Sequence, residues 1–276
     1  MILVNGKILE FTQFPDNTSS FRFDVDGSIN RLDWERYEIE WRYDSDTECI
    51  LLWYLVNHIR SVAGCDAIIY LYLPYIPNAR MDRVKNEDEV FTLKWFANFI
   101  NELCFERVVV LDPHSNVATA LIDNVLVVQP EEFIQKAIDT ISTDDLIGSD
   151  ELLLCYPDEG AAKRYSELME TEYIFGIKHR DWRTGQIARL ELTTPEKVAG
   201  RAVLIVDDIC SRGGTFTHTA TALREAGAKA IYLYVTHCEN TIFKGSVLTD
   251  GMIQHVFTTN SIYRGEHEKV TVLGKE

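Results

Sequence analysis

The residues whose types and spacing point most directly to chemistry lie in one short segment, residues 203–215. Four apolar residues, 203–206, precede the acids Asp207 and Asp208, and the motif Ser211-Arg212-Gly213-Gly214-Thr215 follows. Free N–H groups in a glycine turn and the first turn of a helix can face a phosphate with no Cβ in the way. The two acids stand where sugar hydroxyls or a bound cation would be met. The segment therefore predicts a site for a sugar phosphate.

The elements around this segment form one βαβ unit. Residues 203–206 have the apolar run of a strand buried on both faces, the helix after the turn is closed by Gly227, and residues 231–235 read as a second strand. In such units, ligands sit at the carboxyl ends of the strands. An isolated Asp-Asp pair is more often a solvated loop, but the Gly-Gly-Thr that follows at this offset favours a binding site.

Composition limits the function classes. The chain has 276 residues, enough for two domains, and its net charge of −16 argues against binding a nucleic-acid backbone. Its six cysteines include no Cys-x-x-Cys pair, so we expect reduced thiols and neither a zinc ribbon nor a disulfide framework. No apolar run approaches a membrane span, and residues 1–10 do not have the pattern of a leader. We expect a cytoplasmic protein without membrane association.

Strand and helix patterns alternate along the chain. Residues 67–73 and 107–111 are strand-like, and residues 92–104 place Leu93, Phe96, Ala97 and Ile100 on one helical face. A second series has strands at 151–155 and 173–177 with a helix at 159–169 between them. The alternation predicts an α/β protein with two domains.

Four separate stretches together resemble one enzyme family. The loop at 207–215 resembles the phosphoribosyl-diphosphate loop of type I phosphoribosyltransferases and of ribose-phosphate diphosphokinases, also called phosphoribosyl pyrophosphate synthetases. The stretch Leu73-Pro74-Tyr75-Ile76-Pro77-Asn78-Ala79-Arg80-Met81-Asp82-Arg83 resembles the part of the diphosphokinases that carries ATP-binding arginines, which phosphoribosyltransferases lack. Val110-Leu111-Asp112-Pro113-His114 and Tyr156-Pro157-Asp158-Glu159-Gly160 match in the right order, and Lys178 and Arg180 fall where the family keeps a catalytic Lys-x-Arg. The chain is thus identified as a member of the diphosphokinase family.

The resemblance implies a fold and a reaction. The fold is two phosphoribosyltransferase-type domains, each a mainly parallel sheet flanked by helices: residues 1–128 form a diphosphokinase domain with the ATP-binding segment, and residues 129–276 a phosphoribosyltransferase-like domain with the sugar-phosphate loop. The reaction is a Mg²⁺-dependent transfer of the β,γ-diphosphate of ATP to the anomeric hydroxyl of ribose 5-phosphate, which gives the 1-diphosphate and AMP. Catalysis of such a transfer rests on positioning and on neutralising phosphate charge.

The resemblance also implies roles for single residues. Lys178 and Arg180 are the catalytic candidates, at the start of residues 178–194, which we expect to form a mobile catalytic loop. Mg²⁺ prefers oxygen donors, so Asp158 is the expected metal ligand, with His114 acting directly or through water. The ATP-binding candidates are Arg80, Asp82, Arg83, Phe14 and Asp16, and the sugar-phosphate candidates are Asp207, Asp208, Ser211, Arg212, Gly213, Gly214 and Thr215.

One departure from the family pattern leaves the acceptor open. The family loop usually reads Asp-Thr-Gly-Gly-Thr, whereas this chain has Ser211 and Arg212 before the glycines. The change adds about two units of positive charge, each worth on the order of 1 kcal/mol when partly desolvated. This favours a more anionic acceptor, such as ADP-ribose, which has a free anomeric hydroxyl and would lead to ADP-ribose 1-diphosphate and NAD metabolism. Ribose 5-phosphate remains the expected acceptor, because it is the acceptor that the resemblance to the family implies.

Two further function classes remain open from the sequence. One is a non-catalytic relative that binds nucleotides and regulates a partner, which the retention of Lys178 and Arg180 disfavours. The other is a phosphoribosyltransferase that consumes the 1-diphosphate with a base, which the segment around Arg80 and Arg83 disfavours. We expect a homo-oligomer, with a dimer as the modest assumption.

Overall fold

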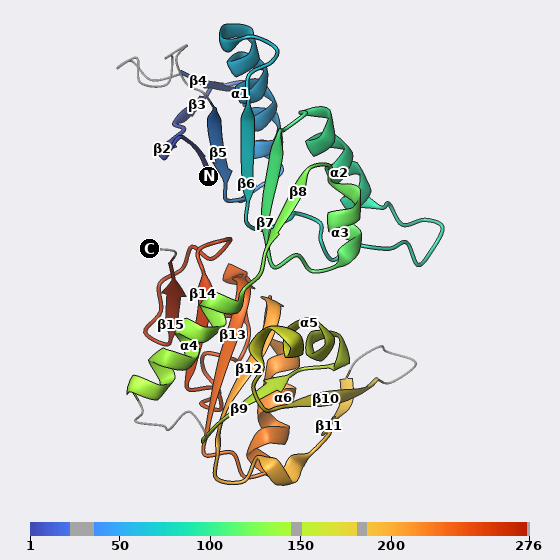
Figure 1. Ribbon diagram of the computed structural model, residues 1–276, viewed down its shortest axis with the longest axis vertical. Coiled ribbons are helices and arrows are strands. Elements are labelled where there is room, and N and C mark those ends of the chain that lie inside the picture. Colours follow the sequence, from blue (N-terminus) through green and yellow to red (C-terminus); the bar gives the residue numbers. More distant parts are fainter. Residues whose placement is uncertain (23–35, 145–150, 181–186, 275–276) are drawn as a thin grey trace. The chain divides into compact units, whose positions relative to one another are not determined.

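The structure is a computed structural model that describes residues 1–22, 36–144, 151–180 and 187–274; of Arg180, Ile187 and Ala188 at the ends of two strands, and of Asp144 at the end of a helix, only the backbone is described. The chain divides into two compact units, Met1–Val128 and Gln129–Glu276 (Figure 1). Each unit has its own mixed sheet with helices packed on it. The expected α/β architecture is confirmed.

The first unit is built on a six-stranded sheet with the order β2-β1-β5-β6-β7-β8. Its strands are β1 (Ile2–Val4), β2 (Lys7–Ile8), β5 (Tyr37–Trp41), β6 (Ile69–Leu73), β7 (Arg107–Leu111) and β8 (Val125–Val128). Its helices are α1 (Thr47–Ala63), α2 (Thr92–Glu102) and α3 (Asn116–Leu121). β5 to β8 are parallel, and β1 pairs antiparallel with both β2 and β5.

Alternation of side chains decides which face of this sheet is buried. In β5 and β6, every second residue is buried, including Ile39, Trp41 and Leu71. These side chains form one core with apolar residues of α1 and α2, such as Leu55 and Phe96. The residues between them point to the opposite face, as the two-residue period of a strand requires.

A small hairpin stands apart from this sheet. It consists of β3 (Phe11–Gln13) and β4 (Ser19–Phe21), which pair antiparallel. The turn between them is closed by a hydrogen bond from the N–H of Phe14 to the carbonyl of Thr18, 2.8 Å long.

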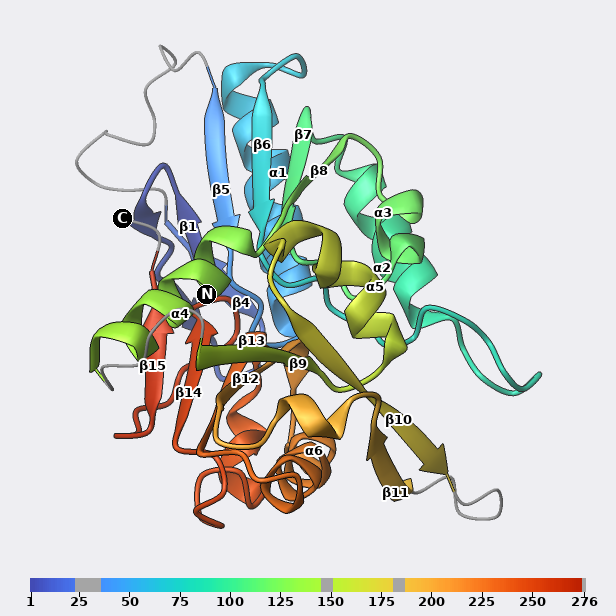
Figure 2. The same cartoon turned by 60° about the horizontal axis from the view of Figure 1, so that its bottom comes forward.

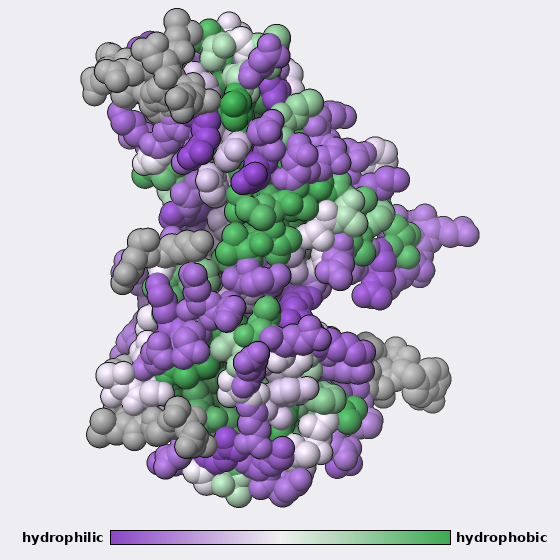
Figure 3. All heavy atoms as spheres, in the orientation of Figure 1, coloured by the Kyte–Doolittle hydropathy of each residue, from purple (hydrophilic) through white to green (hydrophobic). Residues whose placement is uncertain are grey.

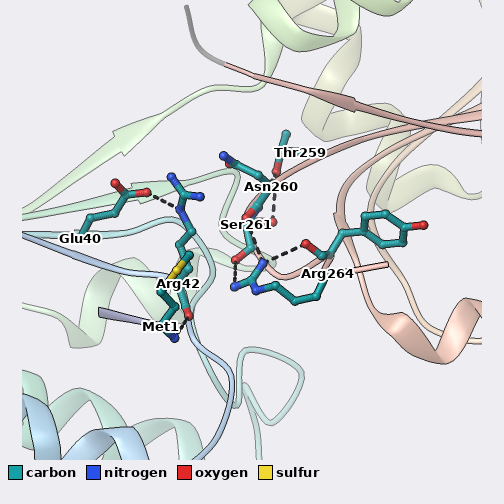
Figure 4. A network of polar contacts seen from close by, with 8 residues as sticks. Met1, Glu40, Arg42, Thr259, Asn260, Ser261 and Arg264 are labelled. Carbon is teal, nitrogen blue, oxygen red and sulfur yellow. Dashed lines mark hydrogen bonds and ion pairs between the residues drawn. The ribbon is translucent and has the colours of Figure 1, made fainter. Parts of the chain in front are cut away.

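Near the start of the chain, the Met1 nitrogen donates to the carbonyl of Arg42 at 2.8 Å (Figure 4).

The second unit has a seven-stranded sheet with the order β11-β10-β9-β12-β13-β14-β15. Its strands are β9 (Leu152–Tyr156), β10 (Tyr173–Arg180), β11 (Ile187–Leu192), β12 (Ala202–Cys210), β13 (Ala230–Cys238), β14 (His255–Thr259) and β15 (Val270–Leu273). Its helices are α4 (Glu131–Asp144), α5 (Glu159–Met169) and α6 (Gly214–Glu225), with the 3-10 turns η2 (Pro195–Lys197) and η3 (Asn240–Lys244). All neighbouring pairs are parallel except β10 with β11.

The direction of the crossovers reverses between β9 and β12. The connection through α5 leads from β9 outward to β10, whereas the connection through α6 leads from β12 the other way to β13. Right-handed crossovers in opposite directions place their helices on opposite faces. Accordingly, Phe216 of α6 packs with Val203 on one face, and Tyr165 of α5 stacks on Tyr156 on the other, with ring centroids 6.0 Å apart. Figure 2 shows α5 and α6 on opposite sides of β9.

Several sequence expectations can be compared with these elements. The helix expected over 159–169 and the strand expected over 107–111 are confirmed. The strand before the glycine motif is longer than expected, because it continues through both acids to Cys210. The loop expected over residues 178–194 is wrong in its described parts: Lys178 pairs with Leu190 in an antiparallel hairpin of β10 and β11.

Two further observations concern the whole of the described chain. All six cysteines are free thiols, and Cys155, Cys210 and Cys238 are buried. None of the helices in the described residues has the length and apolar character needed to cross a membrane.

The buried carboxylate of Glu48 on α1 offers a test of the first unit. Its side chain is 6% exposed and accepts hydrogen bonds from Trp41 Nε1 and from the N–H of Asp44, both at 2.8 Å. The other carboxylate oxygen contacts the Met1 ammonium group. The substitution Glu48→Gln removes the negative charge and turns an NH2 donor toward that ammonium group, and we expect it to lower the free energy of unfolding by about 1–3 kcal/mol. Urea denaturation followed by tryptophan fluorescence measures this. Glu106→Gln, at an exposed position, is the control; an equal effect of both variants would contradict the role given to Glu48.

Candidate functional site

The candidate site lies at the carboxyl ends of β9 and β12. These neighbouring strands flank the point where the crossover direction reverses, and in open α/β sheets ligands bind in the crevice outside that point. Asp158 follows β9, and Asp207 and Asp208 lie near the end of β12, with the glycine motif directly after it. The structure thus brings together the residues that the sequence predicts for the sugar phosphate with one predicted metal ligand.

The glycine motif forms a tight connection between β12 and α6. Gly213 has φ = 79°, a left-handed conformation that favours glycine, and α6 begins at Gly214. A Cβ on Gly213 would overlap the side chain of Val247, and a Cβ on Gly245 would overlap the carbonyl of Arg212. The backbone of the motif is therefore fixed by close packing against residues 245–247. Near Gly214, in contrast, an added Cβ would meet nothing within 4 Å, which leaves room for a ligand at the helix start.

The two acids at the end of β12 have different surroundings. Asp208 is only 4% exposed, and Arg164 of α5 contacts its carboxylate at 3.1 Å. Asp207 is partly exposed; its Oδ1 accepts a hydrogen bond of 3.0 Å from the N–H of Asp208. Desolvation and the negative charges of Asp208 and Asp158 raise the pKa of Asp207 well above its usual value. A cation or a sugar hydroxyl beside Asp207 would relieve this repulsion.

Asp158 and Lys178 form an ion pair at the same edge of the sheet. The Nζ of Lys178 lies 2.6 Å from Oδ2 of Asp158, and the N–H of Ala161 donates to Oδ1 at 3.0 Å, so that Asp158 also caps α5. Burial alone would raise the pKa of Asp158, but the hydrogen bonds from Lys178 and Ala161 outweigh it and lower the pKa. The Lys178 side chain is 13% exposed. A largely buried ammonium group thus stands at the edge where the glycine motif lies.

Other predicted residues are less defined by their contacts. The backbone of Arg180 ends β10, and its side chain lies outside the described residues. His114 belongs to the first unit, where it follows β7 and is partly buried. Within the described ranges, no group of three or more His, Cys, Asp or Glu side chains is arranged to hold a metal ion.

The predicted ATP-binding arginines lie in the connection between β6 and α2. Arg80 and Arg83 are exposed, and Nε of Arg83 lies 3.1 Å from Oδ1 of Asp82. Just before them the chain is anchored, because Ile76 and Ala79 are each 2% exposed. Asp82 therefore orients Arg83 on a segment that is fixed at its start.

Phe14 and Asp16 lie in the turn of the β3–β4 hairpin. The carboxylate of Asp16 accepts hydrogen bonds from the hydroxyl of Thr18 at 2.7 Å and from its N–H at 3.0 Å, and these bonds lower the pKa of Asp16. Phe14 is 53% exposed. Asp16 thus stabilises the turn that presents the Phe14 ring to solvent.

Sequence reasoning missed three residues that shape the site. Arg164 pairs with Asp208, Gly245 admits the backbone of Arg212, and Ser246 lies 3.1 Å from Thr217 in α6, oxygen to oxygen. Arg164 could have been noticed in the sequence, because it lies in the helix that is expected directly after Asp158. Gly245 and Ser246 have none, since only the folded chain brings them to the glycine motif.

A network of side chains supports the adjacent strand ends. His237 at the end of β13 is 3% exposed, and its Nδ1 lies 2.9 Å from the hydroxyl of Ser261. Thr259 donates to the carbonyl of Thr236 at 2.7 Å. Arg264 donates to the carbonyl groups of the same turn, including that of Ser261 at 3.2 Å (Figure 4). These bonds hold the turn after β14 in a single conformation.

Comparison with known proteins shows which type of domain this arrangement resembles. A family model for the phosphoribosyl transferase domain matches residues 162–246, which include α5, the two acids and the glycine motif. The second unit therefore contains a phosphoribosyl transferase domain.

The relatives place the chain more narrowly. It is 28% identical over 208 residues to the ribose-phosphate pyrophosphokinase of Sulfurisphaera tokodaii and 27% identical over 251 residues to that of Pyrococcus abyssi; these matches cover 73% and 90% of this chain and 67% and 79% of the relatives. A match to ribose-phosphate pyrophosphokinase 2, chloroplastic, of Oryza sativa has 30% identity and covers 74% of this chain but about half, 51%, of the relative.

A solved structure agrees with these matches at the level of the fold. The phosphoribosylpyrophosphate synthetase of Mycobacterium smegmatis superposes with a TM-score of 0.71 at 19% identity, covering 96% of this chain and 85% of that one. The chain is thus a divergent relative of the ribose-phosphate pyrophosphokinases, which are transferases.

The contact between Gly245 and Arg212 leads to a prediction for phosphate binding. Gly245→Ala would force the backbone at Arg212 to shift, so we expect the affinity for inorganic phosphate or a sugar phosphate to fall by about tenfold or more, since 1.4 kcal/mol suffices for that. Isothermal titration calorimetry measures the affinity. Gly274→Ala, where a Cβ meets nothing within 4 Å, is the matched control. Unchanged binding by Gly245→Ala would show that this packing does not shape the loop.

Proposed function

We propose that this protein transfers the β,γ-diphosphate of ATP to the anomeric hydroxyl of ribose 5-phosphate, giving phosphoribosyl pyrophosphate and AMP. One observation carries the proposal: the largely buried ammonium group of Lys178 pairs with Asp158 at the carboxyl ends of β9 and β12, where Asp207, Asp208 and the glycine motif also lie. Over most of its length, the chain resembles relatives that are named ribose-phosphate pyrophosphokinase after this activity.

The chain's own residues would act through position and charge. The attacking group is the sugar hydroxyl, so no protein nucleophile is needed. The N–H groups at the start of α6 would bind the 5-phosphate of the acceptor, and Asp207 would accept hydrogen bonds from the sugar hydroxyls. Lys178 would leave Asp158 and neutralise charge that develops on the transferred diphosphate. Arg180, two residues further along β10, would share this work.

Magnesium fits the donor set of this edge. Mg²⁺ prefers oxygen ligands and keeps several waters, and Asp207 and Asp158 offer carboxylates whose mutual repulsion a cation would remove. When bound, the ion would supply neutralisation of negative charge on the phosphate oxygens. His114, in the first unit, stays a predicted metal ligand, directly or through water.

The first unit would bind ATP. Exposed guanidinium groups suit phosphate oxygens because they present a planar fork of donors, and Arg80 and Arg83 provide two on one anchored segment. Asp82 keeps Arg83 in place at 3.1 Å. By the family resemblance, Phe14 in the turn of its hairpin would reach the adenine of a neighbouring subunit, with Asp16 holding the turn. Residues 1–128 thus form the ATP-binding domain and residues 129–276 the sugar-phosphate domain.

The deciding experiment is AMP formation from ATP and Mg²⁺ with ribose 5-phosphate. We expect Lys178→Ala to lower kcat by about 10²–10³-fold, the effect of removing one charge-stabilising group. Lys163→Ala, which removes an exposed lysine paired with Glu159 at 2.8 Å, is the control and keeps its turnover. Full turnover by Lys178→Ala would refute the assignment. An inactive wild type would point to a nucleotide-binding regulator, and diphosphate release from phosphoribosyl pyrophosphate plus a nucleobase would point to a phosphoribosyltransferase.

The glycine motif also favours a second candidate, the same transfer to ADP-ribose. The Arg212 side chain is exposed, and within the described residues it makes no hydrogen bond or ion pair. Its backbone is fixed against Gly245. The guanidinium group is therefore held at the edge of the phosphate loop with its donors available, where a second phosphate beyond the 5-phosphate would extend.

Substitution of Arg212 separates the two acceptors. If ADP-ribose is the acceptor, we expect Arg212→Thr to lower kcat/KM for ADP-ribose by about fivefold to tenfold, the loss of roughly 1 kcal/mol of attraction, and to leave ribose 5-phosphate nearly unaffected. Parallel AMP assays with both acceptors measure this. Arg224→Thr, at the far end of α6, is the control. If the variant has the same kcat/KM as the wild type for each of the two acceptors, Arg212 has no part in selecting the acceptor.

A further inference from the structure

A short segment after β13 borders the glycine motif and extends the candidate site. We call residues 243–246, at the end of η3 and directly after it, the rim segment. A Cβ on Gly245 would overlap the carbonyl of Arg212, so the backbones of these two residues are in close contact. Ser246 lies 3.1 Å from Thr217 of α6, oxygen to oxygen. The rim segment is thus held beside the arginine of the glycine motif and the first turn of α6.

The first residue of the rim segment presents an aromatic ring at the surface. Phe243 is 45% exposed, and its ring centroid lies 6.2 Å from that of Tyr263 and 6.2 Å from that of His267. A Cβ on Gly265 would overlap the Phe243 ring, so only glycine leaves room for the ring there. Three residues after β14 therefore fix the ring, while nearly half of the side chain stays open to solvent.

The place of Phe243, and not its exposure alone, makes it a candidate for binding. Single exposed apolar side chains are ordinary on protein surfaces. Figure 3 shows that hydrophilic side chains cover much of the visible face of the second unit. In the described part of this unit, the other large apolar side chains that are exposed lie in the strands β10 and β15: Tyr173, Ile177 and Val272. Phe243 instead belongs to a segment whose backbone contacts the glycine motif.

Two cations with available donors lie next to this ring. Lys244 follows Phe243 in the chain and is exposed, and Arg212 is exposed as well. Within the described residues, neither of these two side chains makes a hydrogen bond or an ion pair. Their backbones are brought together by the contact at Gly245. In a chain with a net charge of −16, two such cations at one place favour a ligand with more than one phosphate.

The dimensions of the rim segment suit a ligand that is longer than ribose 5-phosphate. The chain advances by at most about 3.6 Å per residue, so the Cα of Phe243 lies at most about 7 Å from that of Gly245. A sugar phosphate whose 5-phosphate binds at the start of α6 would leave the rim segment empty. An acceptor whose 5-phosphate continues into a second phosphate and a nucleoside would pass Arg212 and Lys244 and bring its base to Phe243. Bases stack on aromatic side chains through their flat faces.

We propose that the rim segment binds the nucleoside end of the acceptor ADP-ribose: Phe243 stacks on the adenine, and Lys244 joins Arg212 in binding the second phosphate. The inference rests on the proposed function, because it extends the site at which the 5-phosphate of the acceptor would bind. Phe243 and Lys244 select the acceptor and take no part in the transfer itself. They serve the acceptor and not ATP, which the first unit would bind.

Acceptor selection by the full chain tests the inference, with AMP formation measured for ADP-ribose and for ribose 5-phosphate. Phe243→Leu keeps an apolar side chain against Tyr263 but removes the flat ring. We expect it to lower kcat/KM for ADP-ribose about tenfold, the loss of one stacked base, and to leave kcat/KM for ribose 5-phosphate and the KM for ATP unchanged. Phe243→Tyr, which keeps a ring, should retain the wild-type kcat/KM for ADP-ribose.

A charge variant and a matched control complete the experiment. Lys244→Gln should lower kcat/KM for ADP-ribose about fivefold, and less at high salt, because salt screens the attraction between charges. The control for the ring is Tyr173→Leu: Tyr173 is 38% exposed at the start of β10 and lies against the buried Tyr156, with ring centroids 5.2 Å apart. This variant should convert both acceptors as the wild type does. Circular dichroism checks that all variants are folded.

Each contrary result points to a different error. A wild type that uses ribose 5-phosphate but not ADP-ribose would overturn the inference and leave the proposed transfer standing. If folded Phe243→Leu keeps the wild-type kcat/KM for ADP-ribose, the nucleoside binds elsewhere. A raised KM for ATP in the reaction with ribose 5-phosphate would assign the ring to the donor instead. A wild type that is inactive with both acceptors would refute the proposed function and, with it, this inference.

Discussion

The right-handedness of β-strand crossovers is the constraint on which both units of this protein depend. In the second unit, the order of strands reverses between β9 and β12, so α5 and α6 are placed on opposite faces and leave an opening at the strand ends between them. In the first unit, β5 to β8 are never reversed, so the helices lie on one face and the other stays bare. The same steric rule therefore creates a ligand-binding edge in one unit and an open surface in the other.

Charge balance then determines what the edge of the second unit can bind. Three carboxyl groups meet there, and two of them are matched by a cation from the chain: Asp208 by Arg164 and Asp158 by Lys178. Asp207 is left with the raised pKa, since desolvation and its like-charged neighbours act on it together. A ligand that brings a cation or hydroxyl donors relieves the strain at Asp207, and a ligand that brings phosphate competes with Asp158 for Lys178. A metal-bound sugar phosphate does both.

The sequence predicted local elements and missed what only the folded chain brings together. The apolar runs before Asp158 and before Asp207 gave the buried strands, and the glycine motif gave the start of α6. β12 was expected to end at the acids, yet it continues to Cys210, because residues up to the end of β13 keep pairing with it. The hairpin at Lys178 was missed because its polar residues are typical of a loop, and pairing between neighbouring strands overrides that preference.

The packing of the glycine motif separates the shape of the phosphate site from its charge. The backbone of Arg212 is fixed by Gly245, and that of Gly213 by Val247, so the N–H groups keep their direction whatever side chains occupy positions 211 and 212. Side chains there can change without loss of the fold, since Ser211 is only partly buried and Arg212 is exposed. Under the proposed function, a relative can therefore keep the glycines and alter the charge beside the acceptor through these two positions. In this chain Arg212 places an exposed positive charge there, in a protein whose net charge is −16.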